Sequence, residues 1–301
     1  MGNKRKTALL GGDMRQYYAA LRLAEYGWEP ILWGLPQTTG KSMTLPGCSD
    51  WREAIAGAAV ILLPLPASRD GETLNCPGRQ TPPRLAEILA QAGTGCVIAG
   101  GKIPGHIAAM ARESGHLVFD YYDSEDFQIR NAAVTAEAAV ALGMQSLERT
   151  LAGARVAVVG FGRIARCLAP ILAWLGAEVT VAARRESDLA YAAVAGYETL
   201  RICSDAQDAD CLLPLAQGYD ILYNTVPAWL FGENFLEKTD AGTLFVDLAS
   251  APGGVDAGAA ENYGIRLIRA RSLPGQYAPV SAGELVGDCV ERFLRGEVKT
   301  E

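Results

Sequence analysis

A glycine turn at residues 155–165, RVAVVGFGRIA, has the spacing that cradles the pyrophosphate of a dinucleotide. It matches the pattern G-x-G-x-x-G/A at Gly160, Gly162 and Ala165. The first glycine permits a tight turn, the second lets the backbone approach a pyrophosphate, and the small third residue lets the next helix pack on the strand. An apolar strand precedes the turn and a helical pattern follows it. This context favours dinucleotide binding over an ordinary structural turn.

The end of the next predicted strand, VTVAARRESD at 179–188, bears on which dinucleotide is bound. A carboxylate at this place usually accepts a hydrogen bond from the ribose of NAD, but the position here is Ala183, followed by Arg184 and Arg185. Guanidinium groups bind a 2′-phosphate bidentately, so the sequence favours NADP over NAD. The alternative is a solvated basic turn whose charge Glu186 and Asp188 balance.

Three later segments, YNTVP (223–227), DLASAPGG (247–254) and SLPGQYAP (272–279), are predicted to complete the cofactor site. Each is a strand end followed by small residues and proline, and ligands of open parallel sheets lie beyond the carboxyl ends of the strands. The predicted cofactor contacts are Gly160, Gly162, Arg163, Ile164, Arg184, Arg185, Asn224, Thr225, Pro227, Asp247, Ala249, Leu273, Pro274 and Gly275.

A second glycine turn, GGDMRQ at 11–16, follows the first predicted strand but lacks G-x-G spacing. Asp13 would repel a pyrophosphate there. Arg15 and the backbone amides after Gly12 suit a carboxylate instead. We therefore expect this turn to bind the acid substrate and GFGRIA to bind the cofactor.

Groups that other reaction classes require are missing from the sequence. The two histidines, His106 and His116, lie in the first half, whereas a 2-hydroxy-acid dehydrogenase of this organisation needs one in its second half. We interpret His106 as a helix-face residue and His116 as a residue at the start of a strand. The seven cysteines include no C-x-x-C and accompany no histidine cluster, so we expect no metal site and reduced thiols.

Both halves of the chain alternate apolar strands with amphipathic helical patterns, which is typical of parallel, doubly wound sheets. An alanine-rich helix is expected where the pattern pauses, from Asn131 to Thr150. We predict two Rossmann-like α/β domains joined by a linker helix. The predicted boundaries are a substrate-side domain at 1–130, the linker helix at 131–150, a dinucleotide-binding domain at 151–280 and a C-terminal helix at 281–301 that packs back toward the first domain.

Composition restricts the classes of partner. The 301 residues favour two domains, and the net charge of −7 gives no overall attraction to nucleic acid or anionic membranes. No run of eighteen apolar residues is present, so we expect no membrane span, and MGNKRKT does not resemble a signal peptide.

Four segments together resemble the family formed by the A-subunits of dipicolinate synthases from endospore-forming bacteria. They are GGDMRQ (11–16), NTVP (224–227), DLASAPGG (247–254) and LPGQYAPVSAG (273–283). The resemblance extends over essentially the whole chain and is more specific than the glycine turn alone. The LPG-x-x-AP loop is also similar to that of alanine dehydrogenase and related two-domain enzymes. This likeness supports a fold like that of alanine dehydrogenase and formate/glycerate dehydrogenase-like proteins.

The resemblance implies a function that spacing alone does not. Members of this family oxidise a dihydrodipicolinate-type compound, derived from 4-hydroxy-tetrahydrodipicolinate, to dipicolinate during sporulation. A nicotinamide cofactor, which we expect to be NADP, would accept the hydride. The implied partner is the small, flavoprotein-like B-subunit of the synthase, and the implied location is the mother-cell cytoplasm. We also expect a homo-oligomer. Two alternatives remain: a non-catalytic NADP-binding scaffold, and a dehydrogenase of another small carboxylic acid, which the missing histidine disfavours.

A dicarboxylate substrate calls for cationic or hydroxyl donors, which we expect in the cleft between the domains. The candidate substrate-binding residues are Asp13, Arg15, Ser68, Arg69, Asn131 and Thr135, and the candidate catalytic residues are Glu137 and Ser250. Glu137 would accept a ring proton as the hydride leaves; the alternative is a structural role as a helix cap or in a salt bridge. The chain departs from the family pattern at Pro66 and Arg69. It departs also at Val134, a position at which the family pattern leads us to expect proline.

Overall fold

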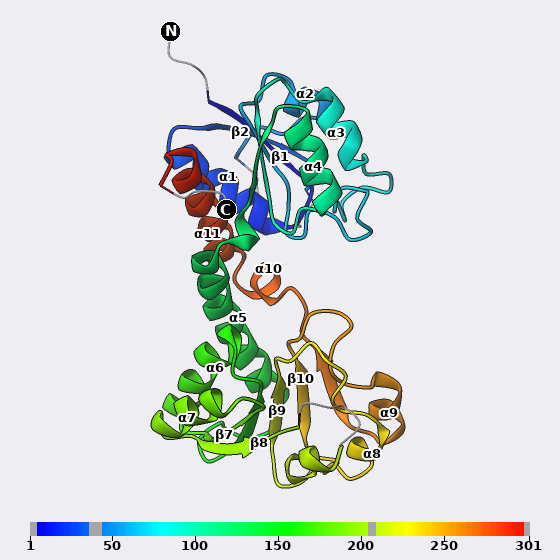
Figure 1. The fold of residues 1–301 in the computed structure, drawn as a ribbon, viewed down its shortest axis with the longest axis vertical. Coiled ribbons are helices and arrows are strands. Elements are labelled where there is room, and N and C mark those ends of the chain that lie inside the picture. Colours follow the sequence, from blue (N-terminus) through cyan, green and yellow to red (C-terminus); the bar gives the residue numbers. More distant parts are fainter. Residues whose placement is uncertain (1–4, 36–43, 204–208, 298–301) are drawn as a thin grey trace. The chain divides into compact units, whose positions relative to one another are not determined.

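The computed structural model describes residues 5–35, 44–203 and 209–297. The chain divides into two compact units. Unit 1 comprises Met1–Asn131 and Pro274–Glu301, and unit 2 comprises Ala132–Leu273. Each unit is built around its own parallel sheet flanked by helices (Figure 1), so the predicted fold class is confirmed. Within the described residues, no helix is long and apolar enough to span a membrane.

Unit 1 contains a five-stranded parallel sheet with the order β2-β1-β3-β4-β5. Its strands are β1 (Lys6–Leu10), β2 (Glu29–Trp33), β3 (Val60–Leu62), β4 (Val97–Gly100) and β5 (Leu117–Asp120). The chain first moves from β1 to one side, at β2, and then to the other side, at β3. The strand order therefore reverses between β1 and β3, which is where open α/β sheets bind ligands.

Both faces of this sheet are buried, because the apolar side chains of β1 and β3 alternate between two clusters. Leu10 and Ile61 pack on one face with the helices α2 (Trp51–Ile55), α3 (Leu85–Gln91) and α4 (Gly105–Glu113). Leu9 and Leu62 pack on the other face with α1 (Met14–Glu25) and α11 (Pro279–Leu294). Burial on both faces explains why these strands read as continuous apolar runs.

Helices α1 and α11 pack closely because α11 presents glycine where the two backbones approach. A Cβ atom at Gly283 would lie 2.5 Å from the carbonyl oxygen of Arg15. A Cβ atom at Gly287, one turn later, would lie 2.8 Å from Cβ of Arg22. The last helix of the chain is thus part of the unit that contains the first strand.

Unit 2 contains a six-stranded parallel sheet with the order β11-β10-β9-β6-β7-β8. Its strands are β6 (Arg155–Val159), β7 (Glu178–Ala183), β8 (Glu198–Arg201), β9 (Ile221–Asn224), β10 (Leu244–Asp247) and β11 (Arg266–Arg269). Counted along the chain this is the order 3-2-1-4-5-6 of dinucleotide-binding folds, with its reversal between β6 and β9. Its helices are α6 (Arg163–Trp174), α7 (Glu186–Val194), α8 (Glu233–Leu236), α9 (Ala257–Asn262) and the 3₁₀ helix η2 (Ala209–Leu215).

Some element boundaries differ from those predicted. The linker helix, α5 (Glu125–Ser146), begins before Asn131 and ends before Thr150. Ser124 Oγ accepts a hydrogen bond from the Phe127 amide, 3.5 Å away, and acidic residues occupy the first turn, so the polar segment 124–130 starts the helix. The predicted loop at 272–279 contains a short helix, α10 (Leu273–Tyr277), and α11 begins at Pro279.

Candidate functional site

The turn after β6 has the geometry that a pyrophosphate requires. Gly160 has a φ of 90°, and a Cβ atom there would lie 2.5 Å from Thr225 Oγ1. Gly162 is the N-cap of α6 with no side chain capping it, and a Cβ atom there would meet nothing within 4 Å. Gly160 is therefore needed by the backbone, whereas Gly162 leaves open space in front of the helix N-terminus. That space fits an approaching phosphate.

The other residues of this turn lie around the same helix start. Ala165 is fully buried, as helix-to-strand packing at the third position of the motif requires. Arg163 is exposed and Ile164 is half-buried, both in the first turn of α6. The predicted pyrophosphate turn therefore lies at the reversal point of the unit 2 sheet, after its first strand.

Arg184 and Arg185 follow β7, the strand that pairs with β6. Both side chains are exposed, and neither is in an ion pair within the described residues. The acidic neighbours have other partners: Asp188 pairs with Arg166 at 3.1 Å and Glu186 pairs with Arg201. The alternative interpretation, in which these acids balance the charge of the two arginines, does not match these contacts.

The ends of β9 and β10 are held together by a buried polar network. Asn224 donates to the Asp247 carboxylate at 2.8 Å. Asp247 also accepts from the Ala249 amide at 3.2 Å and the Gly254 amide at 3.0 Å. Thr225 Oγ1 donates to the Val159 carbonyl at 2.9 Å. These side chains shape the strand ends, so a contact from this region to a cofactor would come from the loops that they position.

Those loops contain residues predicted to contact the cofactor and a residue predicted to be catalytic. Pro227 is exposed beyond β9, and Ala249 is buried beyond β10. Ser250, a predicted catalytic residue, is exposed next to Ala249. On α5, Thr135 is buried, Asn131 is half-buried and Glu137 is exposed. Their roles in binding and proton transfer stay predictions.

At the reversal point of unit 1, Asp13 and Arg15 form a two-point ion pair. Arg15 Nε lies 2.9 Å from Asp13 Oδ1, and Arg15 Nη2 lies 2.8 Å from Asp13 Oδ2. Burial opposes ionisation of Asp13, but the hydrogen bonds and charge of Arg15 outweigh it and lower the pKa of the carboxyl. Asp13 also caps α1 by accepting from the Arg15 amide at 3.0 Å. The charge of Arg15 and its amide are thus used within the turn, whereas the sequence suggested that both await a substrate.

Arg69 is a cation at this reversal point, and no carboxylate within the described residues forms an ion pair with it. It follows β3, its side chain is exposed, and its Nε donates to Asn75 Oδ1 at 3.1 Å. Its charge also helps to lower the pKa of Asp13. Ser68, by contrast, is buried and donates to Asp70 at 2.8 Å, within its own turn.

Asn75 connects the first glycine turn, at Gly12, to the loop after β3, at Pro66. The sequence did not indicate this role of Asn75. Its side-chain nitrogen donates to the Pro66 carbonyl at 2.9 Å, and its backbone carbonyl accepts from the Gly12 amide at 2.8 Å. A Cβ atom at Gly12 would lie 2.7 Å from Pro64 Cβ. The first glycine turn is therefore closed by protein and lacks the open space found at Gly162.

Gly275, predicted to contact the cofactor, has Asp13 and Arg15 as its neighbours. A Cβ atom at Gly275 would lie 2.7 Å from Asp13 Oδ2 and 3.0 Å from Arg15 Nε. Pro274 is buried in unit 1, and Leu273 is buried in the apolar cluster of unit 2. The LPG segment thus places its glycine on the ion pair of the substrate-side turn.

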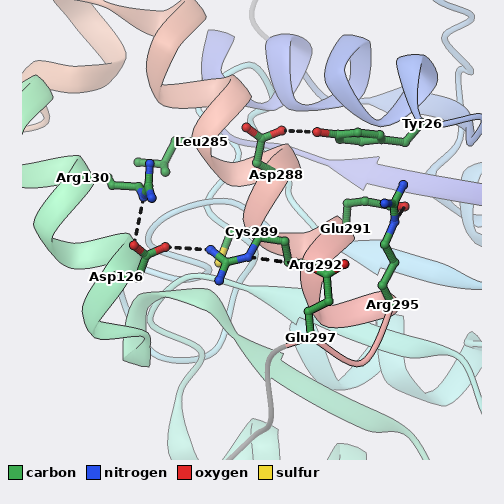
Figure 2. Close-up of a pocket in the computed structure, with 10 residues that line it drawn as sticks. All are labelled: Tyr26, Asp126, Arg130, Leu285, Asp288, Cys289, Glu291, Arg292, Arg295 and Glu297. Atoms are coloured by element: carbon green, nitrogen blue, oxygen red, sulfur yellow. Dashed lines mark hydrogen bonds and ion pairs between the residues drawn. The ribbon is translucent and has the colours of Figure 1, made fainter.

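The cavity drawn in Figure 2 lies against α11 and has a volume of about 220 Å³. Its lining residues are Tyr26, Asp126, Arg130, Leu285, Asp288, Cys289, Glu291, Arg292, Arg295 and Glu297. The charged side chains among them are in ion pairs, for example Arg292 with Asp126 at 2.8 Å and Arg295 with Glu291 at 2.7 Å. Burial raises the pKa of the Cys289 thiol to about 11. The cavity therefore offers a satisfied ion network and an unreactive thiol.

The histidines occupy structural positions. His106 lies on α4 with its Nε2 3.3 Å from Glu72, and His116 lies just before β5 with its Nδ1 3.3 Å from Cys96 Sγ. Their interpretation as helix-face and strand-start residues is thus confirmed. Within the part of the chain that the structure describes, no group of three or more His, Cys, Asp or Glu residues is arranged to hold a metal ion.

The fold is that of two-domain dehydrogenases. An L-alanine dehydrogenase structure matches it with a TM-score of 0.60 at 14% identity, covering 95% of this chain and 88% of that one. More specifically, residues 6–122 match the family model described as the N-terminal domain of the dipicolinate synthase A-subunit.

Two relatives extend this match to the whole chain. The dipicolinate synthase A-subunit of Bacillus subtilis (strain 168) is 28% identical over 297 residues, which cover 98% of this chain and 97% of the relative. The crystal structure of the dipicolinate synthase A-subunit from Bacillus halodurans is 27% identical and matches with a TM-score of 0.81, covering 97% of this chain and 98% of that one. The predicted resemblance to the dipicolinate synthase A-subunit is confirmed.

Proposed function

We propose that this chain is the NADP-dependent oxidoreductase component of a dipicolinate synthase. It would oxidise a dihydrodipicolinate-type compound to dipicolinate, with a proton released and a hydride transferred to NADP⁺. The observation that carries the proposal is the similarity to the Bacillus subtilis dipicolinate synthase A-subunit over 98% of the chain. By the same resemblance, the chain works with the flavoprotein-like B-subunit and acts in the mother-cell cytoplasm of a sporulating bacterium. We further propose that it forms a homo-oligomer.

The glycine turn of unit 2 supports the cofactor. Bound NADP⁺ would supply the hydride acceptor. Gly162 leaves the N-terminus of α6 open to the pyrophosphate. Arg184 and Arg185 supply positive charge for the 2′-phosphate, since neither is in an ion pair among the residues that the structure describes. A ribose-binding carboxylate, which would favour NAD, is absent at Ala183.

The reversal point of unit 1 supports an acid substrate. Arg69 supplies positive charge, while the Asp13–Arg15 pair is internally neutralised and fixes the turn. A dicarboxylate fits this arrangement better than a neutral ligand, because Arg69 forms no ion pair with an acidic side chain of the described residues. Glu137 and Ser250 remain our candidates for handling the proton, and Asn131 and Thr135 for further substrate contacts.

The test is reconstitution. Purified chain, the flavoprotein-like partner, NADP⁺ and freshly generated substrate are mixed, and the ultraviolet absorption of dipicolinate is followed with NADPH formation. We expect one NADPH per dipicolinate. The matched variant is Gly162→Val, which fills the open space before α6 without a backbone clash. It should keep the melting temperature and lose at least about tenfold in NADP⁺ affinity.

A non-catalytic scaffold is the second candidate, because both histidines are engaged in structural contacts. In that case the flavoprotein-like partner would carry out the oxidation, and dipicolinate would form in the mixture without an equal amount of NADPH. A wild-type mixture that binds NADP⁺ but forms no dipicolinate would overturn the enzymatic proposal.

A further inference from the structure

Tyr121 lies at the carboxyl edge of the unit 1 sheet, directly after β5. Its side chain is almost completely buried, with 1% of the residue exposed. Its hydroxyl has no hydrogen-bond partner within the described residues. Among the side-chain oxygen and nitrogen atoms of the described residues, Thr7 Oγ1 is the one that is both fully buried and without a hydrogen-bond partner. The Tyr121 hydroxyl is unpartnered within the described residues but is not fully sealed, so it retains a small contact with solvent.

The ring of Tyr121 lies beside the turn that contains the Asp13–Arg15 pair. A Cβ atom at Gly101 would lie 2.7 Å from Tyr121 Cε2 and 2.6 Å from Leu65 Cδ1, so Tyr121 and Leu65 flank this glycine. The Leu65 carbonyl in turn accepts from Arg15 Nη2 at 2.8 Å. Tyr121, Leu65 and Arg15 thus form one continuous wall along the carboxyl ends of the strands, from β5 to the reversal point between β1 and β3.

Burial keeps the Tyr121 phenol in its donor form. Burial raises its pKa far above the ordinary value, and the charge of Arg15 opposes this only in part. The charges of Asp120 and Asp13 raise the pKa further. At neutral pH the hydroxyl is protonated and available to donate a hydrogen bond to an anion.

The neighbouring backbone holds Tyr121 in place. The Asp120 carboxylate accepts from the amides of Lys102 at 3.0 Å, Ile103 at 2.7 Å and Tyr122 at 2.9 Å, which ties the ends of β4 and β5 together. Lys102 has a φ of 54°, which is unusual for a residue with a side chain. The Tyr121 ring packs on Phe127 with 4.9 Å between centroids. The hydroxyl is therefore pre-positioned.

A purely structural role would not require the hydroxyl. Phenylalanine fills the same space, and a buried tyrosine hydroxyl normally finds a partner because desolvating it without one is costly. Tyr223 shows the ordinary case: it is fully buried, and its hydroxyl donates to the Ala139 carbonyl at 3.2 Å. The partner of the Tyr121 hydroxyl is then to be sought in a ligand.

We propose that the Tyr121 hydroxyl donates a hydrogen bond to a carboxylate of the dicarboxylate ligand, next to the Asp13–Arg15 pair. This inference rests on the proposed function and adds a substrate-binding residue to it. The neutral Tyr121 hydroxyl would bind one carboxylate of the ligand, and the charged Arg69 side chain would bind the other.

The test compares Tyr121→Phe with Tyr223→Phe, two removals of one buried hydroxyl each. Dipicolinate is titrated into each full-length chain at saturating NADP⁺, and binding is measured by calorimetry. Tyr121→Phe should raise the dissociation constant about tenfold or more, as for the loss of one hydrogen bond to a charged group. Its melting temperature should not fall, because the hydroxyl has no hydrogen-bond partner in the described part of the chain. Tyr223→Phe should lower the melting temperature and leave the dissociation constant unchanged.

The outcomes separate this inference from the proposed function. Equal dipicolinate affinity in wild type and Tyr121→Phe would overturn the role of Tyr121 alone. Absence of dipicolinate binding to the wild type would overturn the dicarboxylate substrate and this inference with it. Should Tyr121→Phe fail to unfold cooperatively, the ¹³Cζ resonance of Tyr121 in the wild type decides. A shift of that resonance on addition of dipicolinate supports the contact, and an unmoved resonance rejects it.

Discussion

Two arginines after β7, Arg184 and Arg185, hold charge that their neighbours do not neutralise. Asp188 and Glu186 lie close in sequence, but they pair with Arg166 and Arg201. An exposed ion pair is worth little, so these partners matter mainly because they remove the acids from the turn. What is left at the strand end is a pair of guanidinium groups with a preference for a phosphate.

Replacing both arginines should therefore change the choice of nucleotide. In the double variant Arg184→Ala/Arg185→Ala, we expect NADPH affinity to fall about 10- to 100-fold and NADH affinity to stay within about twofold, because only NADPH has the 2′-phosphate. Fluorescence titration with each reduced nucleotide measures both constants.

Arg201→Ala is the matched control, since it removes a nearby arginine that is paired with Glu186. It should leave NADPH affinity unchanged or lower it slightly, because the freed Glu186 can then approach the two arginines. Equal loss of NADPH and NADH affinity in the double variant would show that the arginines serve the fold of the turn and not the 2′-phosphate.

At the residue scale, sequence spacing predicted the residues whose positions depend on local backbone geometry. It did not predict which charged side chains pair with each other. Gly160 could be predicted because the turn itself demands glycine, and Gly162 because a pyrophosphate that approaches the helix start leaves no room for a side chain. The neutralisation of Arg15 by Asp13 could not, because it depends on how the helix start folds the two side chains together. Tyr121 could not be predicted, since a tyrosine at a strand end is ordinary. Only the structure shows that its hydroxyl has no partner among the described residues.

At the scale of elements, the packing of α11 on α1 supports the substrate-side turn. Helix α1 begins immediately after Asp13 and contains Arg15, and α11 approaches the backbone of that same turn at Gly283. The carbonyl oxygen of Arg15 cannot move aside as a flexible side chain could. Any side chain at Gly283 must therefore separate the two helices.

Gly283→Ala should lower the free energy of unfolding by about 1–3 kcal/mol, because its Cβ atom would lie 2.5 Å from the Arg15 carbonyl oxygen. Urea denaturation followed by circular dichroism measures the change. The matched control is Gly105→Ala at the start of α4, where a Cβ atom meets nothing within 4 Å. That variant should be neutral or slightly more stable, since alanine favours helix. A Gly283→Ala protein as stable as Gly105→Ala would contradict the close packing of the two helices.

Elements with a strong apolar pattern were predictable, and those without one were not. Strand β8 was missed because most of its residues are exposed at the sheet edge, so no apolar run marks it. The start of α5 was missed because its capping serine and acidic first turn resemble a polar loop. The strands β1, β6 and β10 were predicted because burial on both faces leaves a continuous apolar run.

At the scale of the whole molecule, the chain contains two sheets with different strand orders, and each has its own reversal point. Each unit also has its own apolar clusters on the two faces of its sheet. In our proposal the reversal point of unit 2 binds NADP⁺ and that of unit 1 binds the dicarboxylate. A ligand that binds only the folded state stabilises the unit that binds it.

Calorimetry of the full chain should therefore show two unfolding transitions that respond to different ligands. NADP⁺ at about 100 times its dissociation constant should raise the free energy of unfolding of one unit by about 2.7 kcal/mol. Dipicolinate should raise the temperature of the other unit's transition. Gly283→Ala identifies the unit 1 transition by lowering it, and Arg184→Ala/Arg185→Ala should abolish the shift caused by NADP⁺. If both ligands raised the same transition, the assignment of one ligand to each unit would be wrong. A dipicolinate shift that persisted in Tyr121→Phe at low ligand concentration would place the dicarboxylate elsewhere in unit 1.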